Sequence, residues 1–177
     1  MTPPRRRKNG IAMDIGDDQI ISVVLVLALL LLSRVRDLLD NSGLFAATIT
    51  GLTVSLLGHW TWLIALFIFL VIGSVATKWK LEEKKLLSLE EANEGLRSWK
   101  NVLANGGAVS IMAIYNFISP GEEWIYFAAI ASISVALSDT LASEIGSLDT
   151  RTRSITTLQS VPAGTNGGMS PTGTVAA

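Results

Sequence analysis

The feature that most constrains this chain is a series of long segments without a charged residue. Two of them run from Ile20 to Leu32 and from Trp60 to Ala76. A helix needs about 20 mainly apolar residues to cross a bilayer core roughly 30 Å thick, and it satisfies its own backbone hydrogen bonds there. The chain is 49% hydrophobic and 16% charged, whereas soluble domains carry about 25% charged residues. The sequence therefore predicts an all-α, polytopic transmembrane helical bundle.

One transmembrane domain, residues 18–177, is predicted to follow a disordered N-terminal tail, residues 1–17. About five spans are expected, near residues 18–39, 44–58, 60–77, 102–118 and 120–145, with inner loops at 78–101 and 147–172 and the start of a further span at 173. The stretch 44–58 is short for a bilayer, so it either uses its flanks to cross or stays partly re-entrant.

Two polar sequences are typical of helix starts. Ser88-Leu89-Glu90-Glu91 has the pattern of a capping box and predicts a short amphipathic surface helix. Ser119-Pro120 places serine as an N-cap and proline at the first helical position, which predicts where the last long span begins.

The distribution of lysine and arginine predicts the orientation. The chain has 14 such residues, and four of them, residues 5–8, precede the first span. The other ten fall at the inner ends of the spans if the N-terminus lies outside, while the outer turns carry none. Cytoplasmic loops are enriched in these residues, so we expect an outside N-terminus, with both long loops facing the cytoplasm.

Composition excludes several kinds of site. The absence of cysteine excludes thiolate metal sites, and a single histidine, His59, excludes a multi-histidine site. A net charge of −1 gives no indication of nucleic acid as a partner. The membrane is the partner that the composition predicts.

Two carboxylates near the inner end of the last span are the candidate catalytic residues. Asp139 and Glu144 follow a nearly apolar stretch, and a carboxylate at membrane depth normally faces a bundle interior or a wet cavity. At about 100° per residue they point about 140° apart, so they do not share one ion unless the helix unwinds before Gly146. Asp139, a turn deeper, is the expected metal ligand. The alternative is that both carboxylates are simply solvated at a helix end.

Two glycine-containing segments on the same side are candidate phosphate sites. Asn105-Gly106 is expected to open the fourth span, where free N–H groups attract anions, although glycines there also permit close helix packing. The segment 164–170 can form a nest of N–H groups or a flexible loop. The predicted nucleotide- and phosphate-binding residues are Asn105, Gly106, Gly164, Thr165, Asn166, Gly167, Gly168 and Ser170, with Arg97 and Lys100 as nearby cations.

Three of these segments carry a family resemblance. The sequences SDTLASEIG at 138–146, VPAGTNGGMSPTGT at 161–174 and VLANGG at 102–107 resemble signatures of the membrane family of plant phytyl-phosphate kinase and animal transmembrane protein nineteen. The resemblance covers roughly residues 20–177. Ala163 stands where that family has a second proline, and the family continues with further helices after residue 174.

The resemblance implies a CTP-dependent kinase that converts an isoprenoid (phytyl or polyprenyl) monophosphate to the diphosphate. Mg²⁺ at Asp139, CTP as donor and a lipid-phosphate substrate are its expected cofactors and ligands, in what is expected to be a prokaryotic cell membrane. A cytidylyltransferase making a CDP-lipid would use the same nucleotide site. The non-enzymatic alternatives are a lipid or ion transporter and a structural membrane subunit.

Overall fold

The computed structural model describes residues 17–87, 89 and 96–177. Its long helices are α1 (Asp17–Val35), α2 (Asn41–Leu57), α3 (Trp60–Lys78), α5 (Trp99–Ile118) and α6 (Glu123–Gly146). The shorter elements are α4 (Leu81–Leu86), β1 (Arg153–Ser154), β2 (Gly168–Met169) and α7 (Pro171–Ala176). The predicted all-α transmembrane fold is confirmed. Three helices, α3, α5 and α6, are long and apolar enough to cross a membrane, and α1 and α2 are shorter apolar helices.

Local side-chain contacts explain where several helices begin. The Asp40 carboxylate accepts a hydrogen bond from the Gly43 amide at 2.7 Å and caps α2. His59 caps α3 by accepting from the amide of Thr61. Ser98 and Asn101 form a capping box at the start of α5. Such contacts satisfy amides that have no partner within the first turn of a helix.

Two predicted helix starts are wrong. Helix α5 begins at Trp99, so Asn105 and Gly106 lie in its interior rather than at its N-terminus. Helix α6 begins at Glu123 after an N-cap at Glu122. Ser119 instead ends α5, because Gly121 has a φ of +95° and the chain turns there. The sequence Ser119-Pro120-Gly121 therefore forms a turn between the two helices and does not cap the start of α6.

The predicted helix start at Ser88 lies outside the described residues, as does the predicted tail except for its last residue. The short helix on this side of the bundle is α4, at Leu81–Leu86. It follows Lys80, whose left-handed backbone, with a φ of 52°, breaks the chain away from α3.

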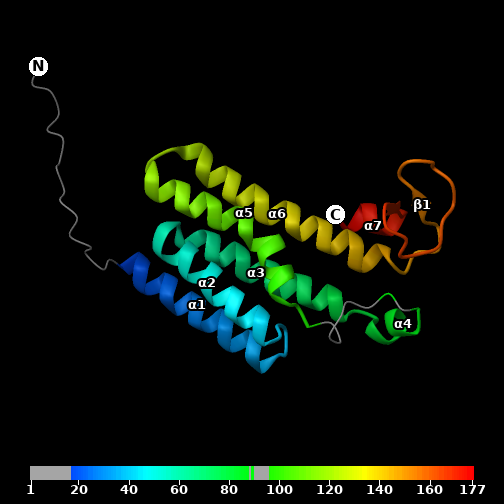
Figure 1. Cartoon of the computed structure of the whole chain (residues 1–177), viewed down its shortest axis with the longest axis horizontal. Coiled ribbons are helices and arrows are strands. Elements are labelled where there is room, and N and C mark those ends of the chain that lie inside the picture. The colour runs from blue at the N-terminus through cyan, green and yellow to red at the C-terminus, as the bar shows by residue number, and fades with distance from the viewer. Residues whose placement is uncertain (1–16, 88, 90–95) are drawn as a thin grey trace, which may run out of the picture.

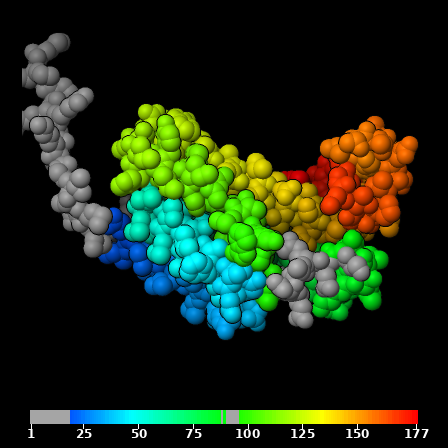
Figure 2. Space-filling view, in the orientation of Figure 1, coloured from blue at the N-terminus to red at the C-terminus, as the bar shows by residue number. Residues whose placement is uncertain are grey.

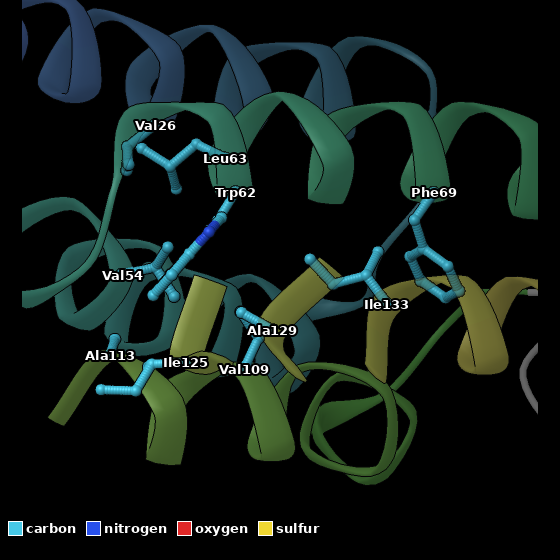
Figure 3. Packing of buried hydrophobic residues seen from close by; sticks show 10 residues of the cluster. All are labelled: Val26, Val54, Trp62, Leu63, Phe69, Val109, Ala113, Ile125, Ala129 and Ile133. Carbon is cyan, nitrogen blue, oxygen red and sulfur yellow. The ribbon is translucent and has the colours of Figure 1, made fainter. Parts of the chain in front are cut away.

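The bundle packs through small residues and one buried tryptophan. In Figure 1, α2 lies beside α1 and α5, and α6 lies beside α3 and α5. A side chain at Gly51 would meet Val26 of α1, and one at Gly106 would meet Thr50 of α2. Figure 3 shows Trp62 pointing from α3 toward Val54 in the core. Small residues let membrane helices approach closely, so Gly106 is accounted for by packing.

The outward faces of the long helices are apolar. Leu31, Phe117, Phe127 and Val135 are each at least 66% exposed, although a soluble bundle would bury side chains of this size. The rings of Tyr115 and Trp124 contact each other at an interplanar angle of 57° near the turn between α5 and α6, where aromatic residues suit a membrane interface. The surface therefore matches a lipid environment along the helices.

One end of the bundle gathers the polar segments. The ends of α1, α3 and α6 and the starts of α2 and α5 meet there, together with α4, the β1–β2 hairpin and α7 (Figure 1). Paired backbone bonds between Leu38, Asp40 and Arg97 join two of the connections. Figure 2 shows α4 and the C-terminal segment at this same end. The ten Lys and Arg residues from Arg34 onward belong to this end. The assignment of this end to the cytoplasm stays a prediction.

Cysteine labelling tests that orientation. Lys84 is only 1% exposed and cannot serve as a labelling site, whereas the side chain of Glu82 in the same helix is 84% exposed. We expect Glu82→Cys to react with a membrane-impermeant maleimide only after the cells are opened, because the basic end faces the cytoplasm. Thr61→Cys at the other end is the comparison. Labelling of Glu82→Cys in intact cells would reverse the orientation.

Gly106 and Gly107 form a matched pair that tests the packing interpretation. A Cβ at Gly106 would lie 2.9 Å from Thr50 Cγ2, whereas a Cβ at Gly107 would meet nothing within 4 Å. We expect Gly106→Ala to lower stability in detergent by about 1–3 kcal/mol through overpacking. Gly107→Ala should be neutral or stabilising by up to about 1 kcal/mol, because alanine favours a helix. Equal effects on the melting temperature would contradict close packing at Gly106.

Candidate functional site

The glycine-rich segment after α6 is a folded structure. Strand β1 pairs antiparallel with β2, with Arg153 opposite Met169. Thr165 donates its amide to the Pro162 carbonyl at 3.2 Å, and Gly168 donates to Thr165 at 2.9 Å. Gly164 and Gly167 have φ angles of 76° and 73°, which favour glycine. We call residues 162–170 the glycine loop. These turns and the strand pair give the segment a defined conformation in this structure.

A polar cavity of about 680 Å³ lies between α6 and the glycine loop. That volume is within the range of sites that hold small molecules, about 300–1,000 Å³. Its walls combine backbone, hydroxyl groups and few apolar side chains. The lining residues are Leu89, Asp139, Ala142, Ser143, Glu144, Gly146, Ser147, Thr152, Gly164–Ser170, Gly173, Thr174 and Ala177. Asp139, Glu144 and all six predicted residues of 164–170 are therefore brought together.

Asp139 is the carboxylate of this cavity that is available to bind a ligand. Its side chain is exposed, and it has no hydrogen bond or ion pair with any described residue. Ser143, one turn later, is exposed on the same side. None of the residues that line the cavity is a lysine or an arginine. A phosphate group bound here would therefore need backbone N–H groups, hydroxyl groups or an accompanying cation.

The glycine loop supplies backbone donors. The amides of Thr165 and Gly168 are used within the loop, whereas those of Asn166 and Gly167 have no acceptor among the described residues. Asn166 and Gly167 are both exposed and line the cavity. Successive free amides at a turn with left-handed residues form a concave site for anions. Two free backbone amides therefore belong to residues that line the cavity.

Glu144 faces the same cavity but belongs to a buried ion pair. Its Oε2 accepts from Lys84 Nζ at 2.7 Å, and its Oε1 accepts from the Thr77 hydroxyl at 2.7 Å. Arg97 also donates to Thr77 Oγ1, at 3.2 Å. Glu144 and Lys84 are 9% and 1% exposed. Glu144 is thus neither a solvated helix end nor a free acid, and it joins α6 to α3 and α4.

Lys84 has further partners at the end of α3. Its ammonium group donates to the carbonyls of Ala76 and Thr77, at 3.1 and 3.4 Å. Those carbonyls belong to the last turn of the helix, where a cation is favourable. Sequence analysis assigned this residue only to a loop rich in lysine and glutamate. The charge pattern did not distinguish it from Lys85, which lies on the surface.

Helix α7 forms another wall of the cavity, and its backbone lies close to the backbone of α6. Ser170 caps α7 and donates its hydroxyl to the carbonyl of Gly146 at 3.2 Å. A Cβ at Gly146 would lie 2.9 Å from Gly173 Cα, and one at Gly173 would lie 2.8 Å from the Ala142 carbonyl oxygen. The predicted phosphate-binding residue Ser170 is buried and serves as this cap. The two glycines let α6 and α7 meet.

Sequence analysis did not identify Asp149. This carboxylate follows α6 and accepts hydrogen bonds from Arg151 Nε and Nη2 at 3.0 and 2.9 Å, and from the Thr172 hydroxyl at 2.9 Å. Hydrogen bonds from Arg151, with smaller contributions from Thr172, hold the pKa of Asp149 well below its usual range. Asp149 therefore stays ionised and holds the start of α7 to the end of α6. The spacing Asp-x-Arg within a polar loop was the available signal.

The other four predicted phosphate-binding residues lie away from this cavity. Arg97, Asn105 and Gly106 line a separate, mainly apolar cavity of about 60 Å³ among α1, α2, α3 and α5. Arg97 is buried there with its guanidinium 5.3 Å from the centre of the Phe69 ring. Lys100 is exposed on the surface beside Trp99. The expected position of Asn105 and Gly106 at a helix start is wrong, because both lie inside α5.

The residues present fit Mg²⁺ only in the presence of a phosphate ligand. In the described part of the chain, no three His, Asp or Glu side chains come together as a metal site. Mg²⁺ is commonly held by one or two carboxylates together with substrate phosphates and water. Asp139 can supply one such carboxylate, whereas both oxygens of Glu144 are already engaged.

Comparison with known proteins gives one family and several relatives. Residues 24–177 match the family described as integral membrane protein DUF92. Uncharacterized membrane protein MJ0933 of Methanocaldococcus jannaschii is 34% identical over 157 residues, covering 88% of this chain and 64% of the relative. Uncharacterized membrane protein sll0875 of Synechocystis is 33% identical, covering 80% and 56%. Protein VTE6, chloroplastic, of Arabidopsis thaliana is 31% identical, covering 72% and 44%.

The chain spans between 44% and 64% of the length of these three relatives. They occur in an archaeon, a cyanobacterium and a plant. No solved structure matches the chain.

The buried ion pair generates a stability prediction. We expect Lys84→Met to lower the stability of the purified protein by about 3–5 kcal/mol, because Glu144 would remain buried without its cation. Lys80→Met is the control: it breaks the exposed Lys80–Glu83 pair, whose loss should cost no more than about 1 kcal/mol. Thermal unfolding in one detergent measures both. Equal melting temperatures for the two variants would show that the pair contributes nothing.

Proposed function

Because this chain belongs to the integral membrane protein family DUF92, we propose that it is a membrane-embedded phosphotransferase. The substrate we propose is an isoprenoid monophosphate, phytyl or polyprenyl, and the phosphoryl donor is CTP. The product is the corresponding diphosphate. Support for the substrate class comes from the signature segments at 102–107, 138–146 and 161–174, which resemble those of the plant phytyl-phosphate kinase family.

The observation that carries the proposal is the position of Asp139 opposite the glycine loop. A free carboxylate and two free backbone amides face one cavity of about 680 Å³. The cavity lies where α6 leaves its apolar stretch, at the basic end of the bundle. A lipid phosphate could keep its hydrocarbon chain in the bilayer while its phosphate reached Asp139. The proposed site faces the cytoplasm, where nucleotide is available.

Phosphoryl transfer requires positioning and charge neutralisation more than covalent chemistry from the protein. A phosphate oxygen of the lipid forms a bond to the γ-phosphorus of CTP, the bond from that phosphorus to the β–γ bridging oxygen breaks, and CDP leaves. Mg²⁺ would neutralise the charge of the nucleotide phosphate chain, and the Asp139 carboxylate would hold the Mg²⁺ ion. In this proposal the amides of Asn166 and Gly167 bind phosphate oxygens. Glu144 acts by orienting α6, since its oxygens are engaged.

The product distinguishes this proposal from its alternative. A cytidylyltransferase that used the same nucleotide site would release pyrophosphate and form a CDP-lipid. A transporter would form neither product. Incubation of the purified protein with CTP, Mg²⁺ and phytyl monophosphate, followed by analysis of released CDP and pyrophosphate, separates these outcomes. Release of CDP with formation of the lipid diphosphate is the expected result.

Asp139→Asn tests the site itself. We expect transfer to fall by about 100-fold or more, because the variant keeps the shape of the side chain and loses the charge that would hold Mg²⁺. Stability should not fall, since Asp139 has no ionic partner among the described residues. Glu123→Gln, at the opposite end of α6, is the control and should leave transfer unchanged. Full activity in Asp139→Asn would remove Asp139 from the mechanism.

A further inference from the structure

Contacts between α6, α4 and the glycine loop form a closed series around the polar cavity. Glu144 on α6 binds Lys84 of α4. The chain then continues from α4 to Leu89, whose side chain packs against Gly164 of the glycine loop. At the other end of that loop, the hydroxyl of Ser170 binds the Gly146 carbonyl of α6. Apart from Lys84, each of these residues lines the cavity.

The contact between Leu89 and Gly164 is a close fit. A Cβ built on Gly164 would lie 2.1 Å from Leu89 Cδ2, and two further side-chain atoms of Leu89 would lie within 3.3 Å. The leucine therefore occupies the space that a side chain at 164 would need. Among the contacts of this series, the one at Leu89 depends on shape rather than on a hydrogen bond or charge. Its strength therefore varies with the size of the side chain at position 89.

Leu89 is held at a fixed position relative to Lys84. Its amide donates to the Lys84 carbonyl at 2.9 Å, and the amide of Leu87 donates to Glu83 at 3.2 Å. Lys84 is itself anchored to Glu144 and to two carbonyls at the end of α3. The ion pair thus anchors Lys84, and the backbone hydrogen bond from Leu89 to Lys84 ties Leu89 to it.

The part of the glycine loop with free amides is held on both sides. Thr165, Asn166 and Gly167 are exposed. After the free amides, the Gly167 carbonyl accepts from the Ile155 amide at 2.9 Å, and the pairing with β1 and the cap at Ser170 follow. Before them, at Gly164, the close side-chain contact is with Leu89. Loss of that contact would leave one side of the loop less restrained, because a glycine with a positive φ has wide backbone freedom.

We propose that Leu89 is a positioning residue for the glycine loop, and that the Lys84–Glu144 pair sets the position of Leu89. The pair and the leucine together help to hold the free amides of Asn166 and Gly167 in the wall of the cavity that Asp139 also lines, where they would bind the phosphate chain of a nucleotide. The ligand named here rests on the proposed function. The mechanical role of Leu89 does not, and it can be measured without any ligand.

The first experiment compares Leu89→Ala with Leu86→Ala. Leu86 is in α4 and is 86% exposed, so its truncation controls for the loss of a leucine from this segment. Hydrogen exchange of the hydrogen-bonded loop amides of Thr165 and Gly168 is measured on the ligand-free protein. We expect exchange to be about tenfold faster in Leu89→Ala, since local opening becomes easier, and unchanged in Leu86→Ala. Exchange in the long helices should be unchanged in both variants, which excludes general unfolding.

The second experiment measures the affinity of the same proteins for Mg²⁺·CTP. We expect about tenfold weaker binding by Leu89→Ala and normal binding by Leu86→Ala, because loosening the loop costs affinity. Leu89→Met conserves volume and should restore both the slow exchange and the affinity. If Leu89 had only a structural role, Leu89→Ala would have a lower melting temperature, and Leu89→Met would not restore the affinity for Mg²⁺·CTP.

The outcomes separate the two proposals. Unchanged exchange of the glycine loop in Leu89→Ala, or equal acceleration in Leu86→Ala, would overturn the positioning role. If the exchange results are as expected but the wild-type protein binds no Mg²⁺·CTP, the positioning role stands and the proposed nucleotide ligand is wrong. If nucleotide binds equally well to wild type and Leu89→Ala despite faster exchange, the loop does not position the nucleotide.

Discussion

Lys84 places its ammonium group against Glu144 at the point where α3, α4 and α6 meet. Two opposite charges removed from water are costly to bury, and their attraction offsets that cost only with close geometry and further hydrogen bonds. Here the Thr77 hydroxyl and two helix-end carbonyls supply those bonds. The Lys84–Glu144 pair therefore favours one arrangement of α3, α4 and α6 over others. The end of α6, and with it the cavity, is oriented by this contact.

The division between apolar and polar parts of the molecule follows from the same physics. Along the helices, apolar side chains face outward and small residues such as Gly51 and Gly106 let the helices touch. At the basic end the chain leaves helical structure, which is feasible where water can reach it. Backbone N–H groups that would be unfavourable within lipid become available to a ligand there. The position of the candidate site is thus a consequence of the membrane boundary.

Sequence analysis predicted the fold class, because long apolar segments separated by polar loops are sufficient for an all-α membrane architecture. It also placed Asp139 and the residues of the glycine loop on the same side of the membrane, and in the structure they line one cavity. The start of α5 was misplaced because apolar periodicity begins at Val102, whereas its capping residues, Ser98 and Asn101, are polar. Lys84 could not be distinguished from Lys85 in the sequence, because a buried and an exposed charge look the same there, whereas the available signal for Asp149, its spacing from Arg151, was not used.

The spacing between Lys84 and Leu89 has a consequence for how this connection can vary. Most loops tolerate insertions, because a longer loop adds little entropy cost to closing its ends. This connection is different, since Lys84 is fixed to Glu144 and Leu89 fills the space above Gly164. One inserted or deleted residue between them would carry the leucine away from the glycine. The connection between Lys84 and Leu89 can therefore change its side chains more readily than its length.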